Sequence, residues 1–447
     1  MKKILLLIII TMSITTSAQQ ILSPEALWKL GRVSAIGISK DGKSIVYKVA
    51  TPSVEENKSN SKFYTIAVTG GNAVEIQEND AKDIVVDKNI SPDGKYILSS
   101  QEVKTENVLG KDFYPELDKS EAQIYDGLDY RHWDTWNNGT HNHVFYAINK
   151  GSKATPIDIM KGEPYDSPQK PFGGDEDYIW SPNSKSIIYV CKKKFGTAYA
   201  ISTNTDLYEF DIETKTTKNL TENNPGYDTN PAFSPQGDLT WLQMKRDGYE
   251  ADKNDIIVRF KGMDINLTAN WDGSVESFKW SPDGNKIYFI AAFDGTLQLF
   301  EIDLKNITVR ASIAANIKQL TNDDFDIRAI VDLSGDNIIV SRTDMNHADE
   351  IYSYNLKKKT WLQLTNTNEE TYSKLALPKF ERRYVTTTDG KKMLVWVILP
   401  PNFDKTKKYP TLLYCQGGPQ SPLTQFYSFR WNFSLMASQG YVVVAPN

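Results

Sequence analysis

A short phrase of serine, proline, aspartate and glycine recurs along most of this chain. Because Asp and Gly tolerate the positive φ angles of tight hairpin turns, each copy predicts a turn between two strands. Most neighbouring copies start about 50 residues apart, and a fixed period of this length indicates a repeat architecture. The copies are Ser39-Lys40-Asp41-Gly42, Ser91-Pro92-Asp93-Gly94, Ser181-Pro182-Asn183, Ser234-Pro235-Gln236-Gly237, Ser281-Pro282-Asp283-Gly284 and the weaker Ser334-Gly335-Asp336.

The second half of each unit shows alternating apolar residues that lead to a Leu-Thr pair. Strand-like segments at 207–212, 299–304 and 351–356 have this pattern. Four short strands in each repeated unit are typical of a β-propeller. The longer interval between Ser91 and Ser181 indicates one further repeat with an insertion. We therefore predict an all-β, seven-bladed β-propeller over residues 19–377.

Composition agrees with this fold and excludes some functions. The 447 residues are 40% hydrophobic and 11% aromatic, which suits a large all-β body. The formal net charge of −5 argues against a nucleic-acid partner, because such proteins normally present a basic face. Cys191 and Cys415 lie in apolar runs, and we interpret them as free, buried thiols. His141 and His143 lack further ligands at metal-binding spacing, so we predict no metal and no cofactor.

The amino-terminal segment has the pattern of a secretory signal peptide. Lys2 and Lys3 precede an apolar core from Ile4 to Ile10, and Thr16-Ser17-Ala18 forms a small-residue cleavage site. The apolar core is too short to span a bilayer. We predict that residues 1–18 are removed and that the protein is periplasmic or secreted, with no membrane span.

Residues 101–142 interrupt the repeats with an aromatic and charged cluster. Its densest part is Tyr130-Arg131-His132-Trp133-Asp134-Thr135-Trp136. A long insertion in a rigid repeat protein is a common place for ligand contacts. A Trp-rich loop more often packs as a small satellite core, so the sequence leaves both readings open.

The carboxyl-terminal segment departs from the propeller pattern. An apolar strand from Thr411 to Cys415 runs into Gln416-Gly417-Gly418-Pro419, and a second strand follows at Tyr441–Ala445. Glycines after a strand let backbone N–H groups approach a ligand, although a plain turn has the same pattern. This order predicts the start of an α/β-hydrolase domain over residues 378–447, and the linker-like Pro400–Asp404 within it favours the same interpretation.

Together these segments resemble the prolyl oligopeptidase family of serine peptidases. The specific part of the resemblance is 408–419 with 440–447. The stretches Tyr130–Trp136, Gly162–Tyr165 and Arg246–Glu250 are similar to the acylaminoacyl-peptidase branch and its bacterial dipeptidyl peptidases. The resemblance implies a propeller that caps a Ser-Asp-His triad and admits short peptides. It also implies that the backbone N–H of Gly418 stabilises the oxyanion.

The triad itself is missing from these residues. The family places its nucleophile in a Gly-x-Ser-x-Gly turn, and the chain has no such sequence. All the histidines, namely His132, His141, His143 and His347, precede the hydrolase strands. We therefore expect a peptidase truncated early in its catalytic domain.

Two classes of function stay open on the sequence. The first is an exported serine exopeptidase that releases dipeptides, and the second is a non-enzymatic periplasmic propeller that binds a protein or peptide. For the exopeptidase, we expect Glu250 to bind the ammonium of the peptide, with Tyr249 beside it, because a buried ammonium needs a carboxylate. A solvated acid in a hairpin turn is the simpler interpretation of Glu250. The sequence leaves the oligomeric state open, a homodimer included.

Overall fold

The repeated Ser-Pro-Asp-Gly phrases form the predicted hairpin turns. In the computed structural model, Ser91 Oγ donates a hydrogen bond to Asp93 Oδ1 over 2.7 Å. The backbone N–H groups of Lys95 and Tyr96 then donate to Asp93 Oδ1 and Ser91 Oγ. Gly94 completes the turn with a φ of 74°, a conformation in which a Cβ would be strained. The same hydrogen bonds recur at Ser39 and Ser281.

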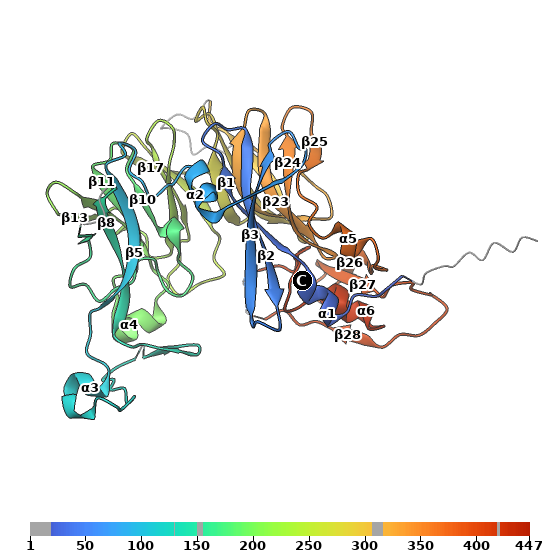
Figure 1. Ribbon diagram of the computed structural model, residues 1–447, viewed down its shortest axis with the longest axis horizontal. Helices are drawn as coiled ribbons and strands as arrows, with labels where there is room; N and C mark the ends of the chain where they lie inside the picture. The colour runs from blue at the N-terminus through green and yellow to red at the C-terminus, as the bar shows by residue number, and fades with distance from the viewer. Residues whose placement is uncertain (1–18, 129, 150–154, 306–315, 418–420) are drawn as a thin grey trace, which may run out of the picture.

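These turns lie within six successive sheets of antiparallel strands, where each turn joins two neighbouring strands of one sheet (Figure 1). The structure describes residues 19–128, 130–149, 155–305, 316–417 and 421–447. Five of the sheets have four strands and the second has three. In sheet order, the strands are β1 Arg32–Ile38, β2 Ser44–Ser53, β3 Lys58–Ala67, β4 Val74–Ile76; β5 Tyr96–Lys104, β8 Thr140–Ile148, β9 Ile157–Asp158; β10 Tyr178–Trp180, β11 Ser186–Cys191, β12 Asp206–Asp211, β13 Thr217–Asn219; β14 Asp228–Phe233, β15 Leu239–Gln243, β16 Asp255–Phe260, β17 Met263–Asn266; β18 Val275–Trp280, β19 Lys286–Phe293, β20 Thr296–Asp303, β21 Asn316–Gln319; and β22 Asp326–Ser334, β23 Asn337–Asp344, β24 His347–Asn355, β25 Thr360–Gln363.

The prediction of seven blades is wrong for the described residues. The interval between Ser91 and Ser181 holds one sheet, because residues 105–139 are inserted between its strands β5 and β8. The innermost strand of this sheet is reduced to a single bridge between Ile90 and Ile97. The long spacing therefore reflects an insertion inside a blade and not an additional blade.

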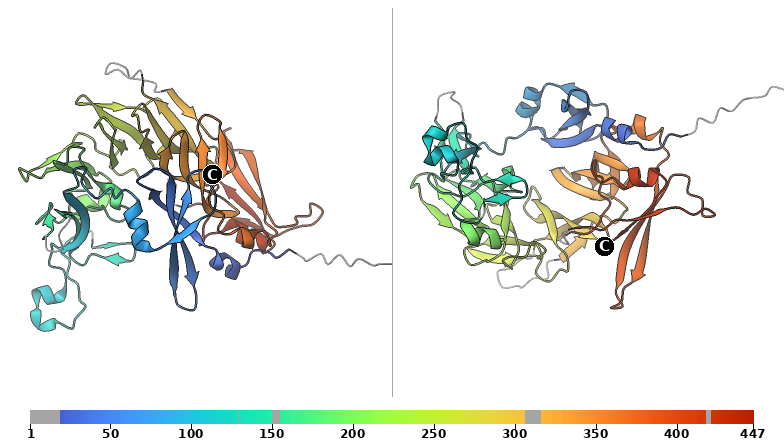
Figure 2. Two further views of the ribbon diagram at one scale, coloured as in Figure 1. Left: turned by 45° about the horizontal axis from the view of Figure 1, so that its top comes forward. Right: turned by 90° about the horizontal axis from the view of Figure 1, so that it is seen from below.

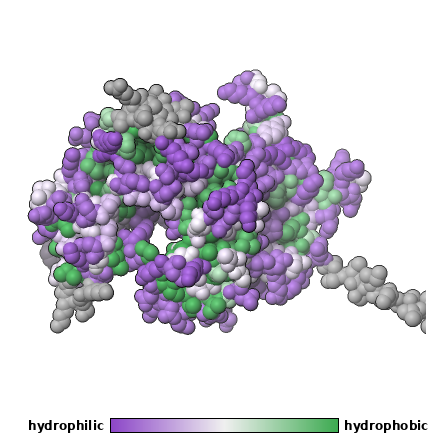
Figure 3. Space-filling view, turned by 90° about the horizontal axis from the view of Figure 1, so that it is seen from above, coloured by the Kyte–Doolittle hydropathy of each residue, from purple (hydrophilic) through white to green (hydrophobic). Residues whose placement is uncertain are grey.

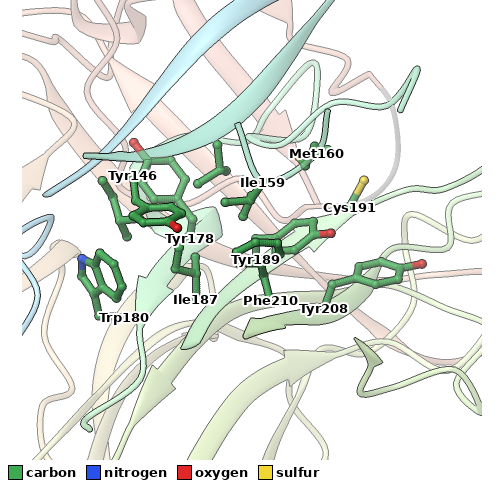
Figure 4. Packing of buried hydrophobic residues seen from close by; sticks show 12 residues of the cluster. Tyr146, Ile159, Met160, Tyr178, Trp180, Ile187, Tyr189, Cys191, Tyr208 and Phe210 are labelled. Atoms are coloured by element: carbon green, nitrogen blue, oxygen red, sulfur yellow. The ribbon is translucent and has the colours of Figure 1, made fainter. Parts of the chain in front are cut away.

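Apolar clusters join most neighbouring sheets into a ring. They lie between the second and third, third and fourth, fourth and fifth, fifth and sixth, and sixth and first sheets. Figure 4 shows the cluster between the second and third sheets, where Tyr146 of the second sheet packs against Trp180 and Phe210 of the third. Between the first and second sheets, the connecting segment that contains helix α2 (Glu78–Ile84) pairs with the turn of the first sheet: Ser39 pairs with Val85, and the Lys40 N–H donates to the Ile84 carbonyl oxygen.

A separate C-terminal sheet follows the ring. Its strand order is β26-β27-β29-β28, and β28 and β29 are parallel while the other pairs are antiparallel. Helix α6 lies between β28 and β29 in the chain. The bounds are β26 Lys379–Thr386, β27 Lys392–Leu399, β28 Thr411–Leu413, α6 Phe433–Ser438 and β29 Val442–Pro446.

Short helices and one hairpin complete the chain. Helix α1 begins after Ser23, whose Oγ accepts the Ala26 N–H, and Leu27 and the C-cap residue Leu30 pack with the C-terminal segment. None of the described helices is long and apolar enough to cross a membrane. The remaining elements are α1 Pro24–Lys29, α2 Glu78–Ile84, α3 Gly110–Phe113, η1 Pro115–Leu117, β6 Arg131–His132, β7 Thr135–Trp136, η2 Asp175–Asp177, α4 Gly196–Ile201 and α5 Glu369–Tyr372.

Candidate functional site

The C-terminal sheet contains the strand that precedes the glycine pair singled out in the sequence. Strand β28 pairs in parallel with β29, and the Tyr414 N–H donates to the Val444 carbonyl oxygen over 2.8 Å. The chain then leaves the sheet through Gln416 and Gly417, which are exposed. Gly418 lies outside the described residues, as does the predicted signal peptide at 1–18. The oxyanion role of Gly418 therefore stays a prediction.

A buried carboxylate fastens this sheet to the ring. Asp326, at the start of β22, accepts hydrogen bonds from Thr424 Oγ1 over 2.5 Å and from the Gln425 N–H over 3.1 Å. The Leu297 N–H donates to the same carboxylate. Burial raises the pKa of Asp326 to about 6, and these hydrogen bonds oppose the rise. Sequence reasoning missed this contact, because nothing in the sequence marks Asp326 or Thr424.

Two hairpin turns of the ring meet the C-terminal sheet. In the β23–β24 turn, Met345 is buried beside Trp396, and Ser434 Oγ lies 2.7 Å from Asn346 Oδ1. Near the β19–β20 turn, Arg382 pairs with Asp294 over 2.9 Å and with Asp324 over 2.5 Å. These turns therefore point to the side of the ring on which the C-terminal sheet lies.

The same side of the ring carries the other candidate segments. In each antiparallel sheet the connection between the second and third strands lies at the end opposite the Ser-Pro-Asp-Gly turn. Residues 105–139, 192–205 and 244–254 are such connections, so they share one face with the C-terminal sheet (Figures 1 and 2). We call this side the tail face. Figure 3 views the opposite face, where hydrophilic side chains surround a central hollow with hydrophobic residues near it.

Glu250 and Tyr249 lie on the tail face in the β15–β16 connection, and both are exposed. The Arg246 guanidinium stacks on the Tyr249 ring at 4.3 Å and pairs with Asp252 over 2.9 Å. The pKa of Tyr227 is raised, first by burial of the phenol and second by the negative charge of Glu250. The role of Glu250 and Tyr249 in binding an ammonium therefore stays a prediction, with both residues on the tail face.

Asp247, two residues before Tyr249, holds this connection in place. Its Oδ1 accepts hydrogen bonds from Ser202 Oγ over 2.7 Å and from the Thr203 N–H over 2.8 Å. In return, the Gly248 N–H donates to Thr203 Oγ1 over 2.9 Å. The hydrogen bonds of Asp247 and the Arg246–Asp252 pair fix the turn that presents Glu250.

The inserted residues 105–139 line a cavity of about 590 Å³. The neighbouring 164–171 and 194–199 segments complete its walls. The satellite-core interpretation is wrong, because Trp133 and Trp136 are 67% and 48% exposed. The two histidines of β8 have protein partners: His143 is buried between Asp158 and the Glu163 carbonyl oxygen, and His141 Nδ1 is hydrogen-bonded to Thr105.

The cysteines meet the prediction only in part. Both thiols are free, and Cys191 is buried between the second and third sheets. Burial raises the pKa of the Cys191 thiol well above its ordinary value. Cys415 is exposed, because it follows the edge strand β28 of the C-terminal sheet.

Known proteins are similar to this chain both in the repeats and over nearly its whole length. A family described as the TolB beta propeller domain matches residues 175–406. Dipeptidyl-peptidase 5 of Porphyromonas gingivalis is 37% identical over 483 residues, which cover 98% of this chain and 69% of the relative. The chain belongs to the dipeptidyl-peptidase 5 family. The enzyme of this name from Porphyromonas endodontalis is 36% identical, over 97% of this chain and 68% of its own length.

Solved structures support the fold of this family member. The acylaminoacyl peptidase of Pyrococcus horikoshii has a TM-score of 0.70 at 14% identity, over 96% of this chain and 67% of the other. Dipeptidyl peptidase 4 of Porphyromonas gingivalis has a TM-score of 0.52 at 13% identity, over 92% and 56%. At such low identity these likenesses show the fold alone. The family relationship supports a peptidase function for this chain.

Proposed function

We propose that this chain forms the propeller and the first hydrolase strands of an exported serine exopeptidase that releases dipeptides from peptide amino termini. The observation that carries the proposal is its 37% identity to a dipeptidyl-peptidase 5 over 98% of the chain. Residues 1–18 supply the export signal, and the mature protein acts in the periplasm or outside the cell.

The C-terminal sheet supports the serine mechanism. Its parallel pair β28–β29, with α6 between them in the chain, is the βαβ unit from which α/β-hydrolase sheets grow. In such enzymes a serine attacks the scissile carbonyl, a histidine takes its proton, and backbone N–H groups bind the developing oxyanion. The turn after β28 is where one of those N–H groups is expected, and Gly418 is our assignment for it.

The propeller supplies substrate selection in this proposal. A dipeptidyl peptidase must distinguish a free amino terminus from an internal amide, and a charged ammonium is best recognised by a carboxylate. Glu250 stands exposed on the tail face, on a turn fixed by Asp247, with Tyr249 beside it. We assign Glu250 to the ammonium and Tyr249 to the peptide next to it.

The decisive experiment is to read the coding sequence past the codon of Asn447. We expect the frame to continue through a Gly-x-Ser-x-Gly sequence and then to an aspartate and a histidine. The extended protein should release dipeptides from a chromogenic dipeptidyl substrate, and its serine-to-alanine variant should not. The 447-residue chain alone should release none, because it lacks the nucleophile. If the extended protein is inert while the 447-residue chain binds peptides, the protein is a binding propeller instead.

A further inference from the structure

The aromatic side chains of the insertion are exposed around a cavity instead of forming a core of their own. Within the described residues, Trp133 is 67% exposed, and Phe195, from the neighbouring sheet, is 65% exposed. Exposed aromatic groups rimmed by polar residues mark binding surfaces more often than chance. Aromatic or apolar lining residues are Val108, Phe113, Ile124, Tyr125, Leu128, Tyr130, Trp133, Trp136, Pro164, Pro171, Phe195 and Tyr199.

The aromatic wall is held in place before any ligand arrives. Tyr125 donates from its hydroxyl to the Asn137 carbonyl oxygen over 2.6 Å. Its ring stacks at 6.2 Å on that of Trp136, which in turn stacks at 5.9 Å on Tyr130. A preorganised wall loses little conformational entropy when a ligand binds.

The neck of the insertion is also fixed. The N–H groups of Thr105 and Glu106 both donate to the Gly139 carbonyl oxygen. Gly139 has a φ of 80°, and a Cβ there would lie 2.3 Å from the Glu106 carbonyl oxygen. Only glycine fits such a close approach, so the two ends of the insertion stay together and the cavity keeps its shape.

Polar groups converge on the floor of the cavity. Asp166 accepts the Asn142 N–H over 2.7 Å and pairs with Lys170 over 3.2 Å. Glu102 lies 3.9 Å from the same ammonium, and His141 lines the cavity beside them. Aromatic walls with a few charged groups at one end suit a ligand that has both an apolar side chain and polar backbone groups.

We propose that this cavity binds a peptide segment by enclosing one large apolar or aromatic side chain. The inference rests on the proposed function, which supplies the peptide, and on the position of the cavity on the tail face. Its volume of about 590 Å³ lies within the range of small-ligand sites, so one side chain and adjoining backbone fit. Trp133 forms one wall against that side chain, and Phe172, outside the lining, holds the Trp133 ring by an edge-to-face contact at 5.5 Å.

Binding to the 447-residue chain tests the inference without any catalysis. Calorimetry would compare the tetrapeptides Ala-Phe-Ala-Ala and Ala-Ala-Ala-Ala. We expect the phenylalanine peptide to bind at least about ten-fold more tightly, and Trp133→Ala and Phe195→Ala each to reduce that preference below about three-fold. Both side chains are largely exposed, so their removal should leave the circular dichroism spectrum unchanged.

The matched control is Trp28→Ala, which removes a 47% exposed tryptophan on α1, outside the cavity lining. This variant should keep the full preference for phenylalanine. Equal binding of the two peptides, or a preference that survives in both cavity variants, overturns the proposal. Binding of chitotetraose in place of both peptides also overturns it and assigns the cavity to carbohydrate. If the extended protein shows no peptidase activity, the peptide-binding results for the 447-residue chain still stand. The two proposals can therefore be rejected independently.

Discussion

At the residue scale, single side chains determine the backbone conformation of the turns and the pH dependence of the fold. Asp93 accepts from the Ser91 hydroxyl and the Lys95 N–H, and these hydrogen bonds, led by that of Ser91, hold its pKa at about 2. The carboxylate is therefore ionised throughout the physiological range. Its partners lie within four residues along the chain, which is why the turn could be recognised from sequence.

Glu250→Gln tests the assigned ammonium contact in the extended enzyme. Loss of the charge should lower kcat/KM on dipeptidyl substrates with a free amino terminus by about 10- to 150-fold, the effect of one charged contact of roughly 1.5–3 kcal/mol. Activity on the same peptides with a blocked amino terminus should be kept. The control is Glu213→Gln, in the exposed β12–β13 turn on the opposite face. An equal loss on both substrate types, or on neither, rejects Glu250 as the ammonium partner.

Asp177 gives the protein a predictable dependence of stability on pH. It is 4% exposed, and burial raises its pKa from 3.8 to about 7, opposed by the hydrogen bond from the Gln169 N–H. A raised carboxyl pKa means that the folded state binds the proton more tightly than the unfolded state does. The stabilisation is complete below pH 3.8 and is lost as the pH rises to about 7.

Asp177→Asn should remove this loss, because the amide stays neutral and its oxygen still accepts the Gln169 N–H. Between pH 5 and 7 the free energy of unfolding of the variant should gain on the wild type by about 1.4 kcal/mol per pH unit. Urea unfolding at pH 5, 6, 7 and 8 measures the difference. A difference that is constant over this range would show that Asp177 does not titrate there.

At the scale of elements, two hairpin turns of the ring pack directly against the C-terminal sheet. The β23–β24 turn buries Met345 against β27, and the β19–β20 turn places Asp294 beside Arg382. Gly295 in that turn has no room for a Cβ, which would lie 2.1 Å from a Leu394 methyl group. Close contact with the sheet therefore selects the residue at the tip of the turn.

Thr424→Ala should weaken this junction. Asp326 is fully buried, with 0% of its surface exposed. The substitution removes the Thr424 hydroxyl that donates a hydrogen bond to Asp326 Oδ2. An unsatisfied buried carboxylate oxygen costs about 1–3 kcal/mol, and urea unfolding should show a loss of that size. Thr406→Ala removes a similar hydroxyl-to-carboxylate bond to Asp404 at the surface and should change stability by less than about 0.5 kcal/mol. Equal effects of the two variants would contradict the assigned role of Asp326.

At the scale of the whole molecule, the ring and the C-terminal sheet share an apolar joint. Leu22, Leu27 and Leu30 from the amino-terminal segment pack with Tyr372 and with Leu435 of α6. Gln20 also pairs with Leu375. The amino-terminal segment therefore belongs structurally to the junction between the ring and the C-terminal sheet, and not to a blade.

Residues 19–377 should fold on their own, because the sheets of the ring bury one another's apolar faces. Their midpoint of thermal unfolding should lie below that of the 447-residue chain, since Met345 and the α1 leucines lose part of their cover. Residues 379–447 alone should be unfolded or aggregate, because Trp396 and the edge strand β28 are left bare. Circular dichroism melts of the three chains test this. Absence of a cooperative transition in 19–377 would reject the boundary at 377.

The sequence by itself determined the features that depend on near neighbours along the chain. The hairpin turns and the alternating strands depend on residues a few positions apart, so their patterns predicted a propeller followed by a different sheet. The resemblance of 408–447 to serine peptidases predicted the family. These signals are local, because hydrogen bonding within a turn and alternation along a strand follow from the order of neighbouring residues.

Tertiary structure alone decided the number of sheets, the exposure of the insertion and the joint with the C-terminal sheet. The spacing between Ser91 and Ser181 is the same for an extra blade and for an insertion inside one, and only strand pairing separates the two. Asp326 and Thr424 are 98 residues apart, and Gly31 and Asn368, which exchange hydrogen bonds, are 337 apart. Such contacts depend on how the ring closes, because a buried polar group takes whichever partner the closed ring brings to it.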